Sequence, residues 1–465
     1  MSGNHLLKVA PICLAVALVG CGDSEIEFRP REETAELIPP AQDYMHELLE
    51  QHFGTPTAAV AWEALPIRYH AATAQVDEAE NGQYKLADID QVLPIEAGQQ
   101  ILWFGDESVR GGHGVLTEFD DESNALSLRP LAGEEGNWTG GPPAGVRVTI
   151  GPGETLAQGR VLYAEHCQHC HGVTGDGNGP TAEYLEPRPR DYRLGKFKFT
   201  STSTVRKARR DDLARIIEDG IPGTYMPSFK LLTKDESTAI VEYVLWLAMR
   251  GETELRRVEV LKLDFLAANA TSPEELTKMM EEFTEAREED FPIDFADEAQ
   301  QIADAWNVAE QDDSVVMPKV ARTPSSPESI AKGREIYLSA TAKCVTCHGE
   351  SGLGDGAQTL QVAKDASGQN YPEPGLHDDW GRLIKPRNLT TGIYRGGRRP
   401  IDLYRRIHSG IKGTPMTGFG TSLSDEQIWD LVNYVMSIPF EDRAPGEGPF
   451  VPSDSAAQET VANAK

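Results

Sequence analysis

Hydrophobic residues recur with two different periods along the chain. Apolar residues at helical spacing predict helices over residues 44–52 and 276–283. Between these helices, short apolar runs bounded by glycine predict β-strands. The predicted strands cover residues 101–104, 114–119, 125–128 and 146–150. The pattern therefore predicts a mainly α chain that is preceded by a small α+β N-terminal region.

Two later segments, residues 155–250 and 329–440, carry the same features in the same order, so we interpret them as diverged copies. Each copy opens with Gly-Arg-x-x-Tyr at helical spacing and closes with a helix that starts at a capping box. The boxes are Thr233 with Glu236 and Ser424 with Gln427. We expect a glycine of each opening helix to lie against a tyrosine of the closing helix, where the two helices cross. These pairs are Gly159 with Tyr243 and Gly333 with Tyr434.

Each copy contains Cys-x-x-Cys-His followed by a glycine-rich loop. The motif residues are Cys167, Cys170 and His171 in the first copy and Cys344, Cys347 and His348 in the second. A Cys-x-x-Cys pair alone could bind zinc or form a redox disulfide. The histidine that follows in both copies favours haem, because two cysteines at this spacing can bind the two porphyrin vinyl groups while the histidine ligates the iron. We therefore predict two covalently attached haem c groups.

A haem used for electron transfer usually has both axial positions filled, so each copy needs a second ligand. Residues 220–226 and 410–416 align as Gly-Ile-x-Gly-Thr-x-Met. Methionine often serves as core packing, but its matching place in a glycine-rich loop of both copies favours ligation by Met226 and Met416. The competing histidines are His166, His169, His377 and His408.

A Pro-Arg pair is also shared by the two copies. Haem carries two propionates, and a buried carboxylate needs a charged partner, which arginine can supply through two hydrogen bonds. Arg190 and Arg387 are the candidates, and a solvated surface position is the alternative for each. Further basic residues follow in both copies, so either an acidic redox partner docks beside the haems or these residues form an ordinary solvated face.

Composition limits the partners. The 465 residues suggest about three domains. A formal net charge of −29 disfavours general electrostatic binding of nucleic acid or anionic lipid, and we predict no nucleic-acid partner. Four of the six cysteines lie in the two motifs, and the other two, Cys13 and Cys21, lie in the N-terminal leader.

The N-terminus has the features of an export signal. Lys8 precedes a short apolar stretch that is too short to span a bilayer. Residues 18–21, Leu-Val-Gly-Cys, resemble the lipobox of bacterial lipoproteins, in which the cysteine is acylated. We therefore predict lipidation of Cys21 and a membrane-anchored protein on the periplasmic side; an ordinary signal peptide is the alternative.

The predicted order of segments runs from the leader to a disordered tail. Residues 1–21 are the signal peptide, 22–40 a tether, 41–150 a region of unknown role, and 151–250 the first haem domain. Residues 251–327 form an acidic helical connector between the haem domains, 328–440 the second haem domain, and 441–465 the tail.

The two copies resemble class I cytochrome c domains of bacterial type, through the Cys-x-x-Cys-His motif, the glycine-rich loop, the Pro-Arg element, the methionine loop and the terminal helices. The resemblance implies a small helical fold around one haem in each copy. It also implies that a proline carbonyl supports the ligand histidine. Pro180 fits that role in the first copy, whereas Ala357 stands at the corresponding place in the second. The second copy has an additional segment at about residues 358–379.

The whole layout looks like membrane-anchored cytochromes of respiratory chains. It implies a dihaem electron carrier, not an enzyme, between redox partners such as a quinol-oxidising complex and a terminal oxidase. The alternatives are a dihaem peroxidase or dehydrogenase with one haem as its active site, and a structural haem subunit of a larger respiratory complex.

Overall fold

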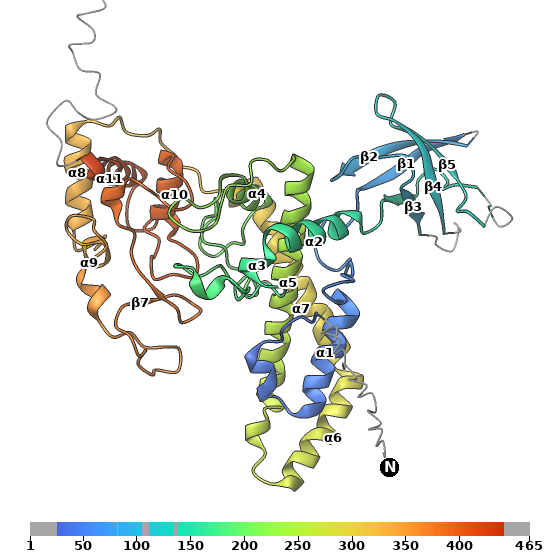
Figure 1. Cartoon of the computed structure of the whole chain (residues 1–465), viewed down its shortest axis with the longest axis horizontal. Coiled ribbons are helices and arrows are strands. Elements are labelled where there is room, and N and C mark those ends of the chain that lie inside the picture. The colour runs from blue at the N-terminus through green and yellow to red at the C-terminus, as the bar shows by residue number, and fades with distance from the viewer. Residues whose placement is uncertain (1–25, 81, 105–110, 134–137, 139, 441–465) are drawn as a thin grey trace, which may run out of the picture.

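A computed structural model describes residues 26–440, apart from residues 81, 105–110, 134–137 and 139. The described chain forms a β-barrel, a helical arm and two repeat domains (Figure 1). The two repeat domains, domain 1 and domain 2, lie side by side, and the barrel extends from domain 1 on the side away from domain 2. Among the described residues, no helix combines the length and the apolar character needed to cross a membrane.

The N-terminal strands close into a six-stranded antiparallel barrel in the order β1-β2-β5-β4-β3-β6. Its strands are β1 (Ala72–Glu80), β2 (Gln83–Gln91), β3 (Gln100–Trp103), β4 (Gly112–Asp120), β5 (Ala125–Arg129) and β6 (Arg147–Ile150). The sequence pattern predicted the last four strands and missed β1 and β2. The inward side chains of β1 are Ala72, Ala74 and Val76, which are too small to give a strong alternating signal. The chain is therefore of mixed α and β structure, and the prediction of a mainly α chain was wrong.

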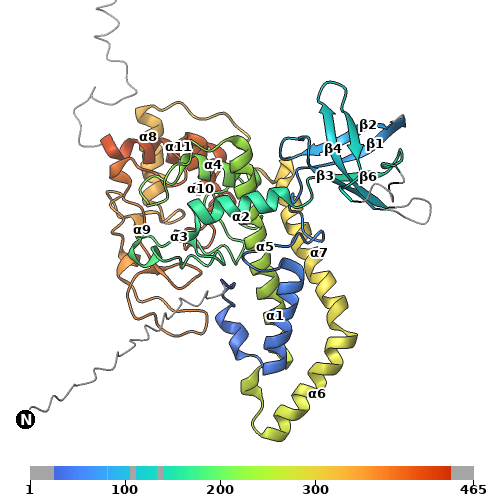
Figure 2. The ribbon, with the colours of Figure 1, turned by 45° about the vertical axis from the view of Figure 1, so that its right-hand side comes forward.

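A bundle of helices forms the arm, which extends away from the repeat domains (Figure 2). It consists of α1 (Pro39–Phe53), the second half of α5 (Lys234–Asp264), α6 (Pro273–Glu289) and α7 (Phe291–Glu310). The predicted helix over residues 44–52 thus belongs to the arm and not to a common domain with the strands. Tyr44 of α1 contacts Phe283 of α6 and Phe291 of α7, with ring centroids 5.9 and 5.3 Å apart.

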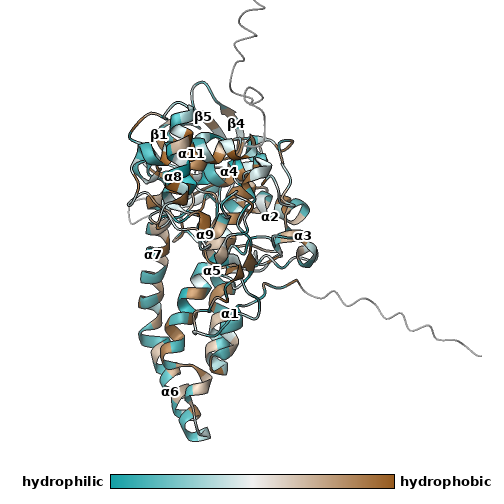
Figure 3. Cartoon of the chain, turned by 90° about the vertical axis from the view of Figure 1, so that its left-hand side faces the viewer, coloured by the Kyte–Doolittle hydropathy of each residue, from teal (hydrophilic) through white to brown (hydrophobic). Residues whose placement is uncertain are grey.

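The acidic connector was predicted to pack between the haem domains, and this was wrong. The two repeat domains contact each other directly, while α6 and α7 extend outward with hydrophilic residues along their surface (Figure 3). Helix α5 also runs through the predicted boundary at residue 250 without a break for 31 residues. Periodicity identifies the apolar face of a helix but does not identify the surface that covers it, so the partner was not predictable.

Residues 26–40, which were predicted to belong to a tether, pack against the rest of the protein. Leu37 and Ile38 are fully buried, and Phe28 packs on Trp246 with ring centroids 5.8 Å apart. Arg29 forms a 2.9 Å ion pair with buried Asp176 of domain 1. Residues 26–40 therefore belong to the folded body. The predicted signal peptide, Cys21 and the tail at 441–465 lie outside the described residues.

The two repeat domains share one arrangement of helices. Domain 1 contains α2 (Glu154–His166), α3 (Gln168–His171), α4 (Arg210–Asp219) and the first half of α5; domain 2 contains α8 (Pro327–Leu338), α9 (Val345–His348), α10 (Pro400–Ser409) and α11 (Asp425–Ser437). Domain 2 also has a two-stranded sheet of β7 (Leu376–His377) and β8 (Leu383–Ile384), which lies in and just after its additional segment. Both predicted capping boxes are present.

The predicted crossings of opening and closing helices are confirmed. A Cβ atom on Gly159 would lie only 2.9 Å from the Cβ of Tyr243, and one on Gly333 only 2.7 Å from the Cβ of Tyr434. Each would also overlap a backbone carbonyl of the closing helix, that of Ala239 or Asp430. Glycine is required at both crossings because the backbone carbonyl cannot move aside.

Domain 1 and domain 2 are joined by polar contacts across a long interface. Arg382 of domain 2 donates a 2.9 Å hydrogen bond to the carbonyl of Pro189, and Lys196 pairs with Asp379. The Nζ of Lys412 is enclosed by domain 1 and donates to the hydroxyl of Thr202 at 2.8 Å. All three cations thus bind residues of the other domain.

Replacing Gly333 by alanine should destabilise domain 2, because the new methyl group meets the Asp430 carbonyl. We expect a loss of about 1–3 kcal/mol in the free energy of unfolding, the usual cost of overpacking. Thermal or denaturant unfolding of the haem-loaded protein measures the change. Lys332→Ala, at an exposed position of the same helix, is the matched control. Equal stability of the two variants would contradict the assigned crossing.

The domain interface should strengthen as the pH rises above neutrality. Burial lowers the pKa of Lys412 to about 7, although Asp212 opposes the shift and Lys207 adds to it. Exposed lysine has a pKa of 10.5, so between these two values the unfolded chain binds more protons than the folded one, and stability rises with pH. We expect wild-type stability, measured against Lys412→Met by thermal unfolding, to increase from about pH 7 to about pH 9. A difference that is independent of pH would contradict this.

Candidate haem sites

Each Cys-x-x-Cys-His motif is held in place by a tyrosine and a glycine-rich loop. The Tyr163 hydroxyl donates a 2.8 Å hydrogen bond to the carbonyl of Gly172, just after the first motif, and Tyr337 donates at 2.7 Å to Gly349 after the second. The Gly-Arg-x-x-Tyr pattern thus places a tyrosine under each motif. The short helices α3 and α9 end at these glycines, which have φ of 79° and 75°.

The glycine-rich loops fold back onto the carbonyls of the motifs. Gly177 donates to the carbonyl of His171 at 2.9 Å, and Gly354 donates to that of His348 at 2.8 Å. A Cβ atom on Gly179 would lie 2.5 Å from the carbonyl oxygen of His169. The loop can approach the motif this closely only without side chains, which explains its composition.

Both motif histidines are oriented by a backbone carbonyl. The Nδ1 of His171 lies 3.2 Å from the carbonyl oxygen of Arg190, and the Nδ1 of His348 lies 3.2 Å from that of Arg387. A carbonyl can only accept, so each Nδ1 carries the proton and each Nε2 keeps a lone pair for a metal. The expectation that Pro180 would be the acceptor was wrong, because the Pro-Arg element itself provides the carbonyl in both domains.

The surrounding protein keeps these imidazoles neutral. Desolvation lowers the pKa of His171 to about 4 and also lowers the pKa of His348. Burial raises the pKa of the Cys167 thiol to about 12 and that of Cys344 to about 11. A neutral imidazole with an available Nε2 is the form that ligates iron.

The two methionine loops have the same conformation. In domain 1, the Ile221 amide donates to the Met226 carbonyl at 3.1 Å, and the Thr224 hydroxyl donates to the Ile221 carbonyl at 2.8 Å. In domain 2, Ile411 and Met416 make the same contact at 3.0 Å. The repeated Gly-Ile-x-Gly-Thr-x-Met sequence therefore encodes a specific turn that presents methionine at the same place in each domain.

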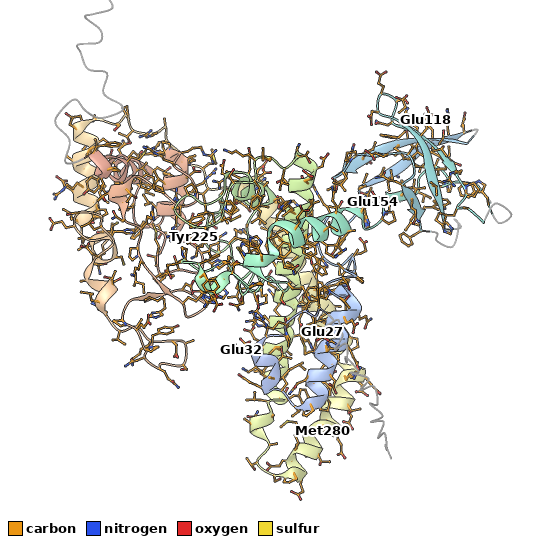
Figure 4. The ribbon with its side chains drawn as sticks, viewed as in Figure 1. Glu27, Glu32, Glu118, Glu154, Tyr225 and Met280 are labelled. Atoms are coloured by element: carbon orange, nitrogen blue, oxygen red, sulfur yellow. The ribbon has the colours of Figure 1, made fainter. Side chains whose placement is uncertain are left out.

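One continuous cavity of about 1000 Å³ is lined by residues of both domains. It contains all the predicted attachment and ligand residues, which are Cys167, Cys170, His171 and Met226 from domain 1 and Cys344, Cys347, His348 and Met416 from domain 2. Tyr225, which also lines the cavity, lies where the two domains meet (Figure 4). Periodicity and motif spacing gave no indication that the two sites would share one space.

The competing histidines are placed differently. His408 stacks on Tyr404 with ring centroids 5.7 Å apart, and His377 stacks on Tyr371 at 3.8 Å; neither lines the cavity. His166 and His169 do line it, and both lie in the sequence next to the motif that contains His171. The arrangement favours the methionines as the second ligands.

The residues around the cavity fit haem c. Arg190, Arg387, Arg395 and Arg406 line it. The Nη2 of Arg190 and the Nε of Arg395 are buried and make no hydrogen bond to any described residue. Such orphaned cationic donors fit the propionate carboxylates of haem, and the alternative of a solvated surface arginine does not hold for Arg190.

Sequence reasoning missed three features of this site. Tyr192 stacks on the ring of His171 with centroids 4.8 Å apart, whereas the corresponding position of domain 2 is Leu389. Trp380, just after the additional segment of domain 2, stacks on the guanidinium of Arg190 at 3.8 Å. Lys412, four residues before Met416, joins the domains. Nothing in the local pattern connects Trp380 with Arg190, since the two residues lie in different domains.

Two segments of the chain match models of known families. Residues 330–439 match the family described as cytochrome c, and residues 154–244 match the family described as cytochrome c oxidase, cbb3-type, subunit III. None of the curated proteins matches the chain. Among solved structures, a chain of the Kuenenia stuttgartiensis reducing HAO-like protein complex is similar, with 27% identity and a TM-score of 0.41 over 60% of this chain and 95% of that one. Two segments of this protein are therefore cytochrome c family domains, and the chain is a multi-haem c-type cytochrome.

Proposed function

We propose that this protein carries single electrons between membrane-associated respiratory partners through two haems with histidine and methionine ligands. The observation that carries the proposal is that each domain supplies both a histidine and a methionine to the shared cavity. Bound haem would supply one-electron chemistry at iron. The protein would hold it through Cys167, Cys170 and His171 in domain 1 and through Cys344, Cys347 and His348 in domain 2.

Ligation from both sides supports electron transfer without bond chemistry. A peroxidase or dehydrogenase needs one axial position open to substrate, whereas Met226 and Met416 would fill that position in each domain. Binding of carbon monoxide or peroxide tests the difference. Rapid binding of either ligand at one of the haems would favour the enzyme.

The type of haem and the sequence of the leader support our proposal for the cellular location. Cytochrome c domains of this kind are extracytoplasmic. We further propose that Cys21 is acylated and anchors the protein on the periplasmic side of a membrane. A quinol-oxidising complex and a terminal oxidase are the proposed donor and acceptor.

A subunit role in a larger respiratory complex is the second candidate. The family matched by residues 154–244 is described as an oxidase subunit, and the β-barrel projects from domain 1 where a further protein could contact it (Figure 1). The wild-type protein and a variant with substitutions on the barrel surface are each purified from membranes. Partner proteins that co-purify with the wild type and are lost from the variant would indicate a stable complex and not a mobile carrier.

Replacing Met226 or Met416 by alanine should leave the haem attached and lower the potential of the altered haem, because the thioether ligand favours reduced iron. Mass determination gives the haem count, and a redox titration gives both potentials. Met280→Ala, on the distant arm (Figure 4), is the matched control. A mass without two haems, or an unchanged near-infrared methionine–iron band in both variants, would refute the proposed sites.

Replacing Cys21 by alanine should release the protein from the membrane fraction, because the acyl chains would be the anchor. Membrane fractionation and the mass of the mature N-terminus measure the effect. Cys13→Ala, earlier in the leader, is the matched control. Retention of the Cys21→Ala protein in washed membranes would contradict lipidation at this residue.

A further inference from the structure

Arg190 and Arg387 each contact both haem sites. The carbonyl of Arg190 accepts from His171 of its own domain, while its guanidinium Nη1 lies 3.4 Å from the position of a Cβ on Gly413, in the methionine loop of domain 2. The carbonyl of Arg387 accepts a hydrogen bond from His348. The Nη2 of the Arg387 guanidinium lies 2.9 Å from the position of a Cβ on Gly223, in the methionine loop of domain 1. The two domains thus exchange arginine side chains across the interface.

Neither glycine can carry a side chain without backbone strain and a clash. Gly223 and Gly413 have φ of 79° and 69°, which side-chain-bearing residues rarely adopt. A Cβ on Gly223 would lie 2.9 Å from the guanidinium of Arg387. A Cβ on Gly413 would lie 2.6 Å from the ring of Trp380, which itself packs on Arg190. The glycines of the methionine loops therefore admit the cation of the opposite domain.

The position of Arg190 is fixed by domain 2. Its guanidinium carbon lies over the Trp380 ring, 3.8 Å from the centroid, and the neighbouring Pro189 carbonyl accepts a hydrogen bond from Arg382. Burial lowers the pKa of Arg190 to about 10, which leaves it charged at neutral pH. Trp380 and Arg382, which follow the additional segment of domain 2, thus hold Arg190 of domain 1 in the cavity.

The cavity is suited to anionic ligands. Its charged lining is almost entirely basic, and Glu186 is the single carboxylate among the described residues that line it. A buried guanidinium without a partner is costly, and the Nη2 of Arg190 has none among the described residues. Two haems would bring four propionate carboxylates. The propionates lie on the porphyrin edge opposite the vinyl groups that the cysteines bind.

We propose that each arginine binds a propionate of the haem attached to the other domain. This proposal rests on the proposed function. Arg190 binds a carboxylate of the haem attached to domain 2, and Arg387 binds a carboxylate of the haem attached to domain 1. The propionate edges of the two haems then face each other within the shared cavity. Each arginine is a positioning residue whose carbonyl orients the histidine of one haem and whose charge raises the potential of the other.

Redox titration of Arg190→Gln and Arg387→Gln tests this exchange. The two haems are told apart by a second substitution, which lowers the potential of the haem whose response to the arginine is not being measured. Met226→His lowers the potential of the domain 1 haem for the Arg190 measurement, and Met416→His lowers that of the domain 2 haem for the Arg387 measurement. Arg334→Gln, which removes a surface cation paired with Glu350 at 3.7 Å, is the control.

We expect Arg190→Gln to lower the equilibrium constant for reduction of the domain 2 haem on the order of tenfold. For a one-electron couple this corresponds to a fall in potential of about 59 mV. Arg190→Lys, which keeps the charge, should restore part of it. Arg387→Gln should act in the same way on the domain 1 haem; its side chain is less enclosed, so this variant tests the proposal even if Arg190→Gln does not fold.

A fall confined to the haem of the arginine's own domain, or no fall in either haem, would overturn the exchange. The proposed function has separate criteria. Loss of two attached haems in the mass, or absence of methionine ligation in the near-infrared spectrum, would defeat that proposal. Two attached, methionine-ligated haems with no effect across the interface would defeat the exchange alone.

Discussion

The direct contact between the two cytochrome c domains determines the character of this protein. It merges two haem sites into one cavity of about 1000 Å³. Buried cations in that cavity, such as Arg190, are stable only if anions accompany them, because desolvation of an unpaired charge is expensive. Bound haem propionates would supply such anions, in addition to nearby carboxylates such as that of Asp378. Contacts such as those of Lys412 with Thr202 and Arg382 with Pro189 hold the domains together on the protein side.

Within each domain, the repeated features are mostly backbone contacts. Tyrosine hydroxyls bind the carbonyls after the motifs, glycine amides bind the motif carbonyls, and arginine carbonyls orient the histidines. The side chains that differ between the copies stand around the ligands. Tyr192 stacks on His171, whereas Leu389 takes the equivalent position in domain 2. A common backbone can thus hold two haems in different surroundings, which is a physical route to two different potentials.

The sequence predicted those parts of the site that depend on neighbouring residues. The motifs, the methionine turns, the capping boxes and the glycine–tyrosine crossings all follow from short patterns compared between the two copies. The barrel, the arm and the domain interface depend on contacts between distant segments, and no local pattern encodes them. Arg190 shows both cases: its proline-arginine pair was recognisable, but the stacking on Trp380 and the approach to Gly413 come from the other domain.

Helix α5 contacts the N-terminal segment, the arm and the first haem domain. Its first half supplies Tyr243 to the crossing in domain 1, and its second half forms the arm, where Arg257 pairs with Glu298 at 2.7 Å. The N-terminal segment packs against the same helix and then reaches the glycine-rich loop, where the Arg29 amide donates to Thr174 at 2.8 Å. Contacts along one helix therefore connect the N-terminal segment and the arm to the loop that surrounds the first motif.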